Sequence, residues 1–176
     1  GDDILFYIDG DGTYQGTVAT VFDGTSRSDL DIYDSHVIVR DDNSGVASNT
    51  TLDTALGAFS DTDIEYSITS SNLTVSGTGT EPYLPSSYSY TPGCSSTTPA
   101  LESKGAVNGG ATTIDINGVL AISGGAFTAT SATMTVADDL VVSGGATYTH
   151  STGTVTLDTT TAADFDAGGQ TFSAVN

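Results

Sequence analysis

The sequence predicts an all-β chain that forms a parallel β-helix, a solenoid of stacked coils, at least in its C-terminal half. Three observations predict this fold: an internal repeat, apolar residues at alternate positions, and Gly-Gly pairs between the apolar runs. Alternation with a period of two indicates a strand with one buried face, and glycine lets the chain turn a tight corner. A short repeat cannot bury its own apolar face, so it must stack on a copy of itself.

The repeat is clearest between Leu120 and Thr160, where two similar units follow each other. Leu120 and the run Ser123-Gly124-Gly125-Ala126 recur as Leu140 and Ser143-Gly144-Gly145-Ala146. After a slip of one residue, Phe127, Met134 and Val136 recur as Tyr148, Val155 and Leu157. Each unit reads as strand, Gly-Gly corner, strand, polar corner, strand. We therefore expect three short strands per coil, each paired with the coils above and below.

Similar fragments flank this pair at Gly109-Gly110-Ala111 and at Gly168-Gly169-Gln170. The stretches ISGGAFTATSATMTV and VSGGATYTHSTGTVTLD match each other coil by coil. This pattern resembles the right-handed parallel β-helix repeats of long bacterial extracellular surface proteins and adhesins. The resemblance covers residues 105–176, and it implies a fold and an extracellular location rather than an activity.

The first half of the chain allows two interpretations. Ile4 to Ile8 is an apolar run, Asp9 to Gly12 a turn, and Thr13 to Phe22 an alternating strand. These segments fit either an antiparallel hairpin or one corner of a coil. Further strands are expected at residues 29–34, 36–40, 51–56, 64–69 and 73–76, and a single helical turn at 54–59. The alternative fold for this N-terminal half is an antiparallel β-sandwich.

All four prolines lie between Pro82 and Pro99, with several tyrosines and the one cysteine among them. Proline cannot donate to a sheet ladder, so we expect a loop that interrupts the stack. Either it connects two halves, or it projects as an arm against a neighbouring subunit or a carbohydrate. The predicted organisation is a β-rich part over 1–80, this loop or arm over 81–104, and β-helical repeats over 105–176.

The charge is strongly acidic: 22 Asp and Glu face three Lys and Arg, a formal net charge of −19. So few cations cannot neutralise a phosphate backbone, which excludes nucleic acid as a partner. The only early apolar run is too short to span a bilayer, so no membrane insertion is expected. An acidic surface suits either solubility outside the cell or the binding of divalent cations.

Calcium is the one cofactor that the sequence suggests. Carboxylates spaced as Asp-x-Asp beside glycine supply the oxygen ligands that Ca²⁺ takes. The EF-hand pattern is not met, because Gly12 and Thr13 follow the first pair and no glutamate closes the loop. The candidate metal residues are Asp9, Asp11, Asp29, Asp31 and Asp34.

No catalytic residue is predicted, and we do not expect an enzyme. His36 and His150 are the only groups suited to act as a base near neutral pH, and both sit at ordinary strand or corner positions. Two N-x-Thr triplets make Asn49 and Asn72 candidates for glycosylation.

The expected function is that of an extracellular structural protein, part of a surface filament, sheath or adhesin stalk. Neither end of the sequence shows a helix, proline or lysine cap, and uncapped strand edges pair with other chains. We therefore expect copies to join head to tail into a homopolymer. The candidate interface residues are Ile4, Leu5, Phe6, Tyr7, Ile8, Tyr83, Tyr88, Tyr90, Cys94, Thr171, Phe172 and Val175.

Two rival functions remain open at this point. The first is a carbohydrate-binding or adhesive module, in which Tyr83, Tyr88, Tyr90 and Tyr148 would form a stacking surface. The second is a segment of a phage fibre, which the number of chains in the assembly would distinguish.

Overall fold

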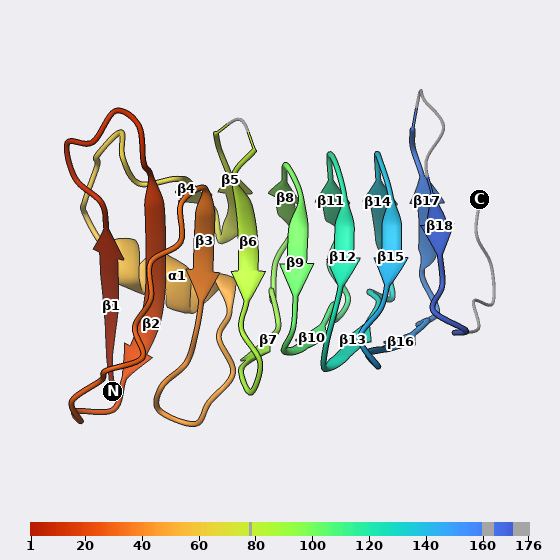
Figure 1. The fold of residues 1–176 in the computed structure, drawn as a ribbon, viewed down its shortest axis with the longest axis horizontal. Coiled ribbons are helices and arrows are strands. Elements are labelled where there is room, and N and C mark those ends of the chain that lie inside the picture. Colours follow the sequence, from red (N-terminus) through yellow and green to blue (C-terminus); the bar gives the residue numbers. More distant parts are fainter. Residues whose placement is uncertain (78, 160–163, 171–176) are drawn as a thin grey trace.

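A computed structural model describes residues 1–77, 79–159 and 164–170. The chain is nearly all β with one short helix, and its stacked parallel strands form a β-solenoid of about seven turns. Figure 1 shows the coils side by side along the long axis, with β1 at one end and β17 and β18 at the other. The predicted fold class is confirmed.

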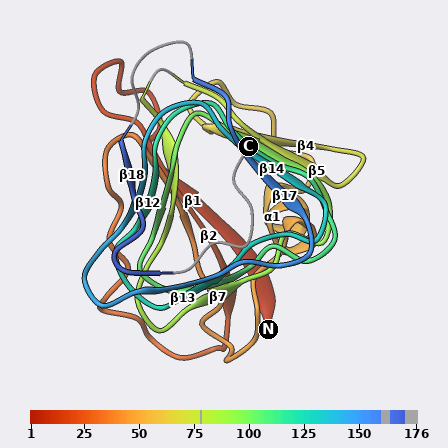
Figure 2. The same ribbon diagram turned by 90° about the vertical axis from the view of Figure 1, so that its right-hand side faces the viewer.

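Three sheets run along the solenoid, and Figure 2 shows them around a three-sided coil. Sheet A has the order β1 (Asp2–Tyr7), β2 (Gly16–Phe22), β3 (His36–Val39), β6 (Glu81–Leu84), β9 (Leu101–Ser103), β12 (Leu120–Ile122), β15 (Leu140–Val142) and β18 (Phe165–Asp166). Sheet B has the order β16 (Thr147–Thr149), β13 (Ala126–Thr128), β10 (Ala106–Asn108) and β7 (Ser89–Tyr90). Sheet C has the order β17 (Thr154–Leu157), β14 (Thr133–Val136), β11 (Ile114–Ile116), β8 (Ser96–Thr98), β5 (Asn72–Val75) and β4 (Tyr66–Thr69).

The pairing register follows the sequence repeat, including its slip of one residue. Leu120 lies beside Leu140, and Met134 lies beside Val155. Phe127 lies beside Tyr148, and their rings stack with centroids 5.9 Å apart. Because like side chains of neighbouring coils meet inside, the core is a set of apolar columns.

Glycine is required where one coil crosses closely over the next. Gly125 has φ +62°, and a Cβ there would overlap the carbonyl oxygen of Gly105 in the preceding coil. Gly144 has the same φ and lies as closely over Ser123. The flanking pair Gly109-Gly110 lies at a different corner, between β10 and β11, so it is not equivalent to Gly124-Gly125.

The N-terminal half continues the parallel stack, because β2, β3 and β6 pair in parallel. The antiparallel sandwich is therefore ruled out for this half. β1 and β2 form an antiparallel hairpin, which decides between the two interpretations of residues 4–22. Residues 29–34 contain no strand.

Residues 51–56 are helical rather than extended. Helix α1 spans Asn49–Leu56, and the Ser48 side chain accepts a bond from the Thr51 N–H in a capping box. Asn49, Leu52 and Ala55 are buried at a spacing of three, so one helix face packs inward and outweighs the β-propensity of the threonines. No helix in the described ranges is long and apolar enough to cross a membrane.

The proline-rich segment 81–104 also differs from expectation. It contains β6, β7, β8 and β9, which add to all three sheets, so it belongs to the stack instead of interrupting it. Pro82 lies beside Val37 on β3, and the ladder to β9 begins one residue later at Tyr83. Pro82 therefore occupies a position of β6 that pairs with β3 on one side but not with β9 on the other.

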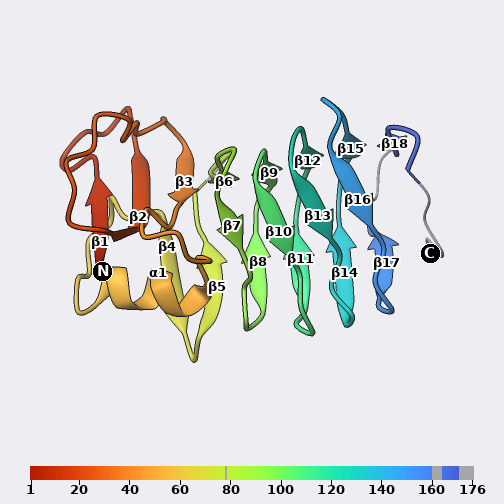
Figure 3. The same ribbon diagram turned by 90° about the horizontal axis from the view of Figure 1, so that it is seen from below.

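The N-terminal end of the solenoid is covered. Figure 3 shows α1 beneath β1 and β2, where later coils have sheet strands. Leu52 is fully buried, and its carbonyl accepts a 2.9 Å bond from the Tyr66 hydroxyl. Helix α1 therefore takes the place of sheet strands on one side of the first coils, and β1 remains the edge strand of sheet A. The coil expected at residues 171–175 lies outside the described residues.

Phe127→Ala tests the apolar column. The ring is 0% exposed and stacked, so its loss leaves a cavity and should lower the free energy of unfolding by about 3–5 kcal/mol. Urea denaturation followed by circular dichroism measures this. Thr128→Ala, at the next and only partly buried position, should cost less than about 1 kcal/mol. Equal losses in the two variants would contradict the inward alternation of β13.

Candidate functional site

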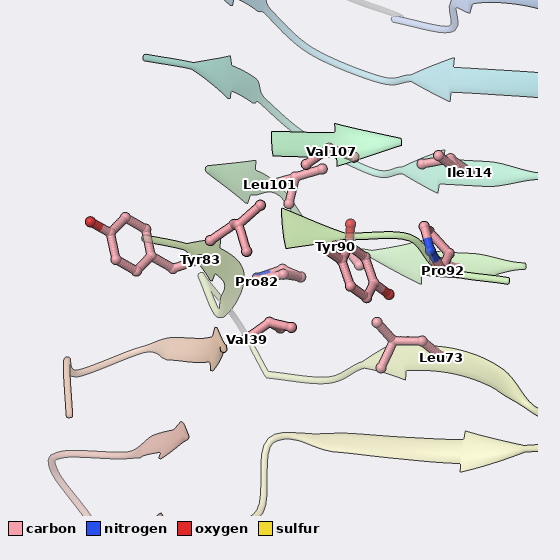
Figure 4. Close-up of a pocket in the computed structure, with 12 residues that line it drawn as sticks. Val39, Leu73, Pro82, Tyr83, Tyr90, Pro92, Leu101, Val107 and Ile114 are labelled. Carbon is pink, nitrogen blue, oxygen red and sulfur yellow. The ribbon is translucent and has the colours of Figure 1, made fainter. Parts of the chain in front are cut away.

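The solenoid interior contains a small apolar cavity, which Figure 4 shows in close-up. It encloses about 30 Å³ and is lined by residues such as Leu84, Val107 and Ile114. That is room for about one water molecule, so this cavity cannot hold a larger ligand. In Figure 4 the Tyr90 ring lies among the core side chains, whereas the Tyr83 ring points away from them.

A larger hollow lies where the long β2–β3 connection meets the β6–β7 connection. It encloses about 190 Å³. We call it the tyrosine hollow; it is lined by Asp29, Asp31, Tyr33, Ile38, Arg40, Tyr83, Pro85, Ser86 and Tyr88. Val37 and Val39 on β3 point into the solenoid core, so Ile38 between them points to the outer face of sheet A. Ile38 is nevertheless buried, because the β2–β3 connection packs over this outer face. The hollow is therefore a surface feature of the solenoid wall.

Three tyrosines give the hollow its aromatic character. Tyr33 is 44% exposed, and its ring meets the Tyr83 ring edge-to-face with centroids 5.7 Å apart. Tyr83 and Tyr88 are partly buried. Each ring offers an apolar face with a polar hydroxyl, the combination that suits amphipathic ligands. Tyr90 and Tyr148, predicted to join this surface, are buried in the core instead.

Arg40 anchors the floor of the hollow. One guanidinium nitrogen donates to the Asp29 carbonyl, and another donates to an Asp42 carboxylate oxygen and the Tyr88 hydroxyl, each at 2.7 Å. The Tyr88 hydroxyl in turn donates to Asp42, and so does the Thr20 hydroxyl, both at 2.7 Å. The guanidinium also lies 4.9 Å from the centre of the Tyr88 ring. These contacts fix the Tyr88 ring in place.

The electrostatics of this network favour the charged forms of Arg40 and Asp42 and the neutral form of Tyr88. Burial alone would raise the pKa of Asp42, but hydrogen bonds from Arg40, Tyr88 and Thr20 outweigh it and hold the pKa below its usual range. Burial raises the pKa of Tyr88, and its bond to Asp42 adds to that effect. Arg27 also donates to the Asp42 carbonyl, at 2.8 Å. Both arginines of the chain are therefore held by Asp42.

The predicted calcium residues do not gather at one place. Asp9 lies with Asp61 and Asp63, and one carboxylate oxygen of each falls within 4.8 Å of the others. The Asp63 carboxylate already accepts bonds from the Gly10 N–H at 2.6 Å and the Gln15 amide at 3.3 Å. Calcium binding there stays a prediction, with two ligands that the sequence analysis did not name.

The other four predicted metal residues have separate roles. Asp11 accepts two backbone N–H bonds in its own turn, at 2.8 and 3.1 Å, and these bonds lower its pKa. Asp34 accepts a bond from the Gln15 N–H at 2.9 Å. Asp29 and Asp31 line the tyrosine hollow. A second set of possible metal ligands, His36 with two glutamates, lies on the outer face of sheet A.

The two glycosylation candidates differ in accessibility. Asn49 is 1% exposed, and its amide donates to the carbonyls of Ser71, Cys94 and Ser95 at 3.0–3.3 Å. A glycan cannot be attached to this side chain in the folded chain. Asn72 is exposed on β5, and glycosylation there stays a prediction.

The predicted interface residues are spread over several environments. The run from Ile4 to Tyr7 lies in β1, at one edge of sheet A, and Ile8 follows it. Cys94 is a partly buried free thiol. Thr171, Phe172 and Val175 lie outside the described residues.

The pH dependence of stability tests the Arg40–Asp42 pair. Because the folded pKa of Asp42 lies below its usual value near 3.8, the pair stabilises the fold above about pH 4, and this contribution is lost as the pH falls through the folded pKa. Asp42→Asn should therefore destabilise the fold at pH 7, and this cost should shrink as the pH falls below about 4, by about 1.4 kcal/mol for each unit by which folding lowers the pKa of Asp42. Thermal melts across this pH range measure the difference. Asp2→Asn, at an exposed position, is the control, and a pH-independent cost would contradict the assignment.

Comparison of the chain with protein-family models, with curated proteins and with solved structures finds no match in any of the three. The functional proposal below therefore rests on the geometry of the site.

Proposed function

We propose that this chain is an extracellular structural segment, a stalk of a surface or adhesin-type protein, which binds a carbohydrate in the tyrosine hollow. The observation that carries the proposal is the convergence of three tyrosine rings, two aspartates and an anchored arginine around one surface hollow. Sheet A forms the base of the hollow, and the β2–β3 and β6–β7 connections on its outer face carry most of the side chains that would contact the sugar.

The chemistry of the hollow suits a neutral sugar. Sugar rings have apolar C–H faces that pack on tyrosine, and hydroxyls that bond to carboxylates. The exposed Asp29 and Asp31 side chains leave the rim acidic, which disfavours acidic polysaccharides. At about 190 Å³ the hollow is smaller than the sites of drug-sized ligands, which begin near ~300 Å³. We therefore expect it to hold one sugar unit or a chain end.

Glycan-array screening followed by calorimetry tests the carbohydrate proposal. Tyr33→Ala and Tyr83→Ala should each weaken binding of a neutral glycan about two- to tenfold, because each removes one stacking face. Tyr14→Ala is the matched control, since Tyr14 is 57% exposed and does not line the hollow. Glycan binding that survives both substitutions would place the sugar elsewhere, and an array without hits would reject the proposal.

End-to-end assembly is the second candidate. Within the described residues, β16 and β17 carry no further strand on their outer sides, and such edges pair with other chains. At the opposite end β1 is the edge strand of sheet A, beside the covering α1. A head-to-tail filament would therefore place the edges at β16, β17 and β18 of one copy against the β1 end of the next copy, so that β18 faces β1 in a continued sheet A.

Sedimentation at several concentrations tests assembly. If edges pair, the average mass should rise with concentration, and Thr156→Lys on the edge strand β17 should suppress the rise. Thr135→Lys, at the paired position on the inner strand β14, is the control and should leave association unchanged. A chain that stays monomeric throughout would reject this candidate.

A further inference from the structure

Three metal-ligating side chains converge on the outer face of sheet A, one from each of three consecutive strands. His36 on β3 lies beside Glu81 on β6, and Glu102 on β9 lies beside Tyr83. Because Tyr83 is two residues from Glu81, all three ligands share one face of the sheet. One ligand atom of each falls within 4.8 Å of the other two. We call this set the histidine–glutamate cluster.

The imidazole of His36 is held in a defined orientation. Its Nδ1 lies 2.6 Å from the Asp34 carbonyl oxygen. A carbonyl oxygen can only accept, so Nδ1 carries the hydrogen of that bond. The ring also packs edge-to-face against Tyr33 and Tyr83, with centroids 6.0 and 5.8 Å away. Nε2 therefore faces the glutamates, and a neutral ring presents its lone pair there, as metal-binding histidines do.

The cluster is partly buried, and the lysine that pairs with it is exposed. Nε2 lies 3.3 Å from a Glu81 oxygen, and both side chains are about three-quarters buried. Lys104 pairs with Glu102 at 3.1 Å, but its side chain is 44% exposed and sits at the rim. A divalent cation between the three ligand atoms would be attracted by both carboxylates.

We propose that His36, Glu81 and Glu102 bind one divalent transition-metal ion of the Zn²⁺ type, with water completing the coordination. One imidazole nitrogen with two carboxylates suits Zn²⁺, whereas Ca²⁺ takes six to eight oxygens. This site is distinct from Asp9, Asp61 and Asp63, which offer oxygen alone. It does not depend on the proposed carbohydrate binding.

The bound metal would tie three coils together beside the tyrosine hollow. β3, β6 and β9 each contribute one ligand. Tyr33 and Tyr83 contact the His36 ring and also line the hollow. The metal would therefore fix the position of these two rings.

Calorimetric titration of the chelator-treated chain with ZnCl₂ tests the site. We expect one Zn²⁺ per chain, and His36→Gln should weaken binding more than about tenfold. His150→Gln removes the only other histidine and is the matched control, which should bind as the native chain does. Absence of heat with the native chain, or equal losses in both variants, would overturn the proposal. CaCl₂ at the same concentration should not displace the bound Zn²⁺, and full displacement would equally overturn it.

Two further variants keep the test decisive if His36→Gln fails to fold. Glu102→Gln should also weaken Zn²⁺ binding, and circular dichroism of the metal-free chain reports whether its fold is intact. Lys104→Met removes the competing cation and should strengthen binding, by about fivefold at most because the pair is exposed. A metal bound elsewhere would leave the affinities of both variants unchanged. Visible absorption of the Co²⁺-loaded chain should likewise change in Glu102→Gln.

Discussion

The fold depends on one constraint: the apolar inward side chains of one coil must pack on those of the next coil. Leu101, Leu120 and Leu140 lie next to one another in successive strands of sheet A. In sheet C, Ile116 lies beside Val136. Because side chains alternate between faces, a slip of one residue would turn such a column outward. The repeat therefore fixes the pairing register, and close corners such as that at Gly125 let neighbouring coils approach.

The same register lines up the outward-facing residues, and this explains where the candidate sites lie. Strands in a sheet are about 4.8 Å apart, so polar side chains at matching positions become close neighbours. His36, Glu81 and Glu102 meet in this way although 45 residues separate Glu81 from His36. The tyrosine hollow lies on the same face, where two connections leave the wall. The inward-facing residues of the sheets form the stabilising core, and the outward-facing residues of sheet A form the candidate sites.

The sequence predicted the parts of the fold that repeat, because residues 120–158 carry the pattern twice. It predicted only a single helical turn at 54–59 and not the full α1, since threonine-rich segments favour strands locally and packing of Leu52 and Ala55 against the first coils favours the helix. Of the hollow, Tyr83 and Tyr88 were predicted as a stacking surface, but Tyr33 and Arg40 were not. These residues are far apart in the sequence, and no local sequence pattern indicates that they lie together in the fold.

Charge placement connects the two candidate sites. Of the three lysine and arginine residues, Arg27 is paired with Asp23, Arg40 with Asp42, and Lys104 with Glu102. The cations are thus held by carboxylates of the chain, and Asp29 and Asp31 keep the rim of the hollow acidic. An anionic ligand would have to displace one of these pairs. Neutral sugars need no such displacement, and a metal cation is attracted by the carboxylates and competes only with the exposed Lys104 for Glu102, so the electrostatics of this face of sheet A favour both ligand classes.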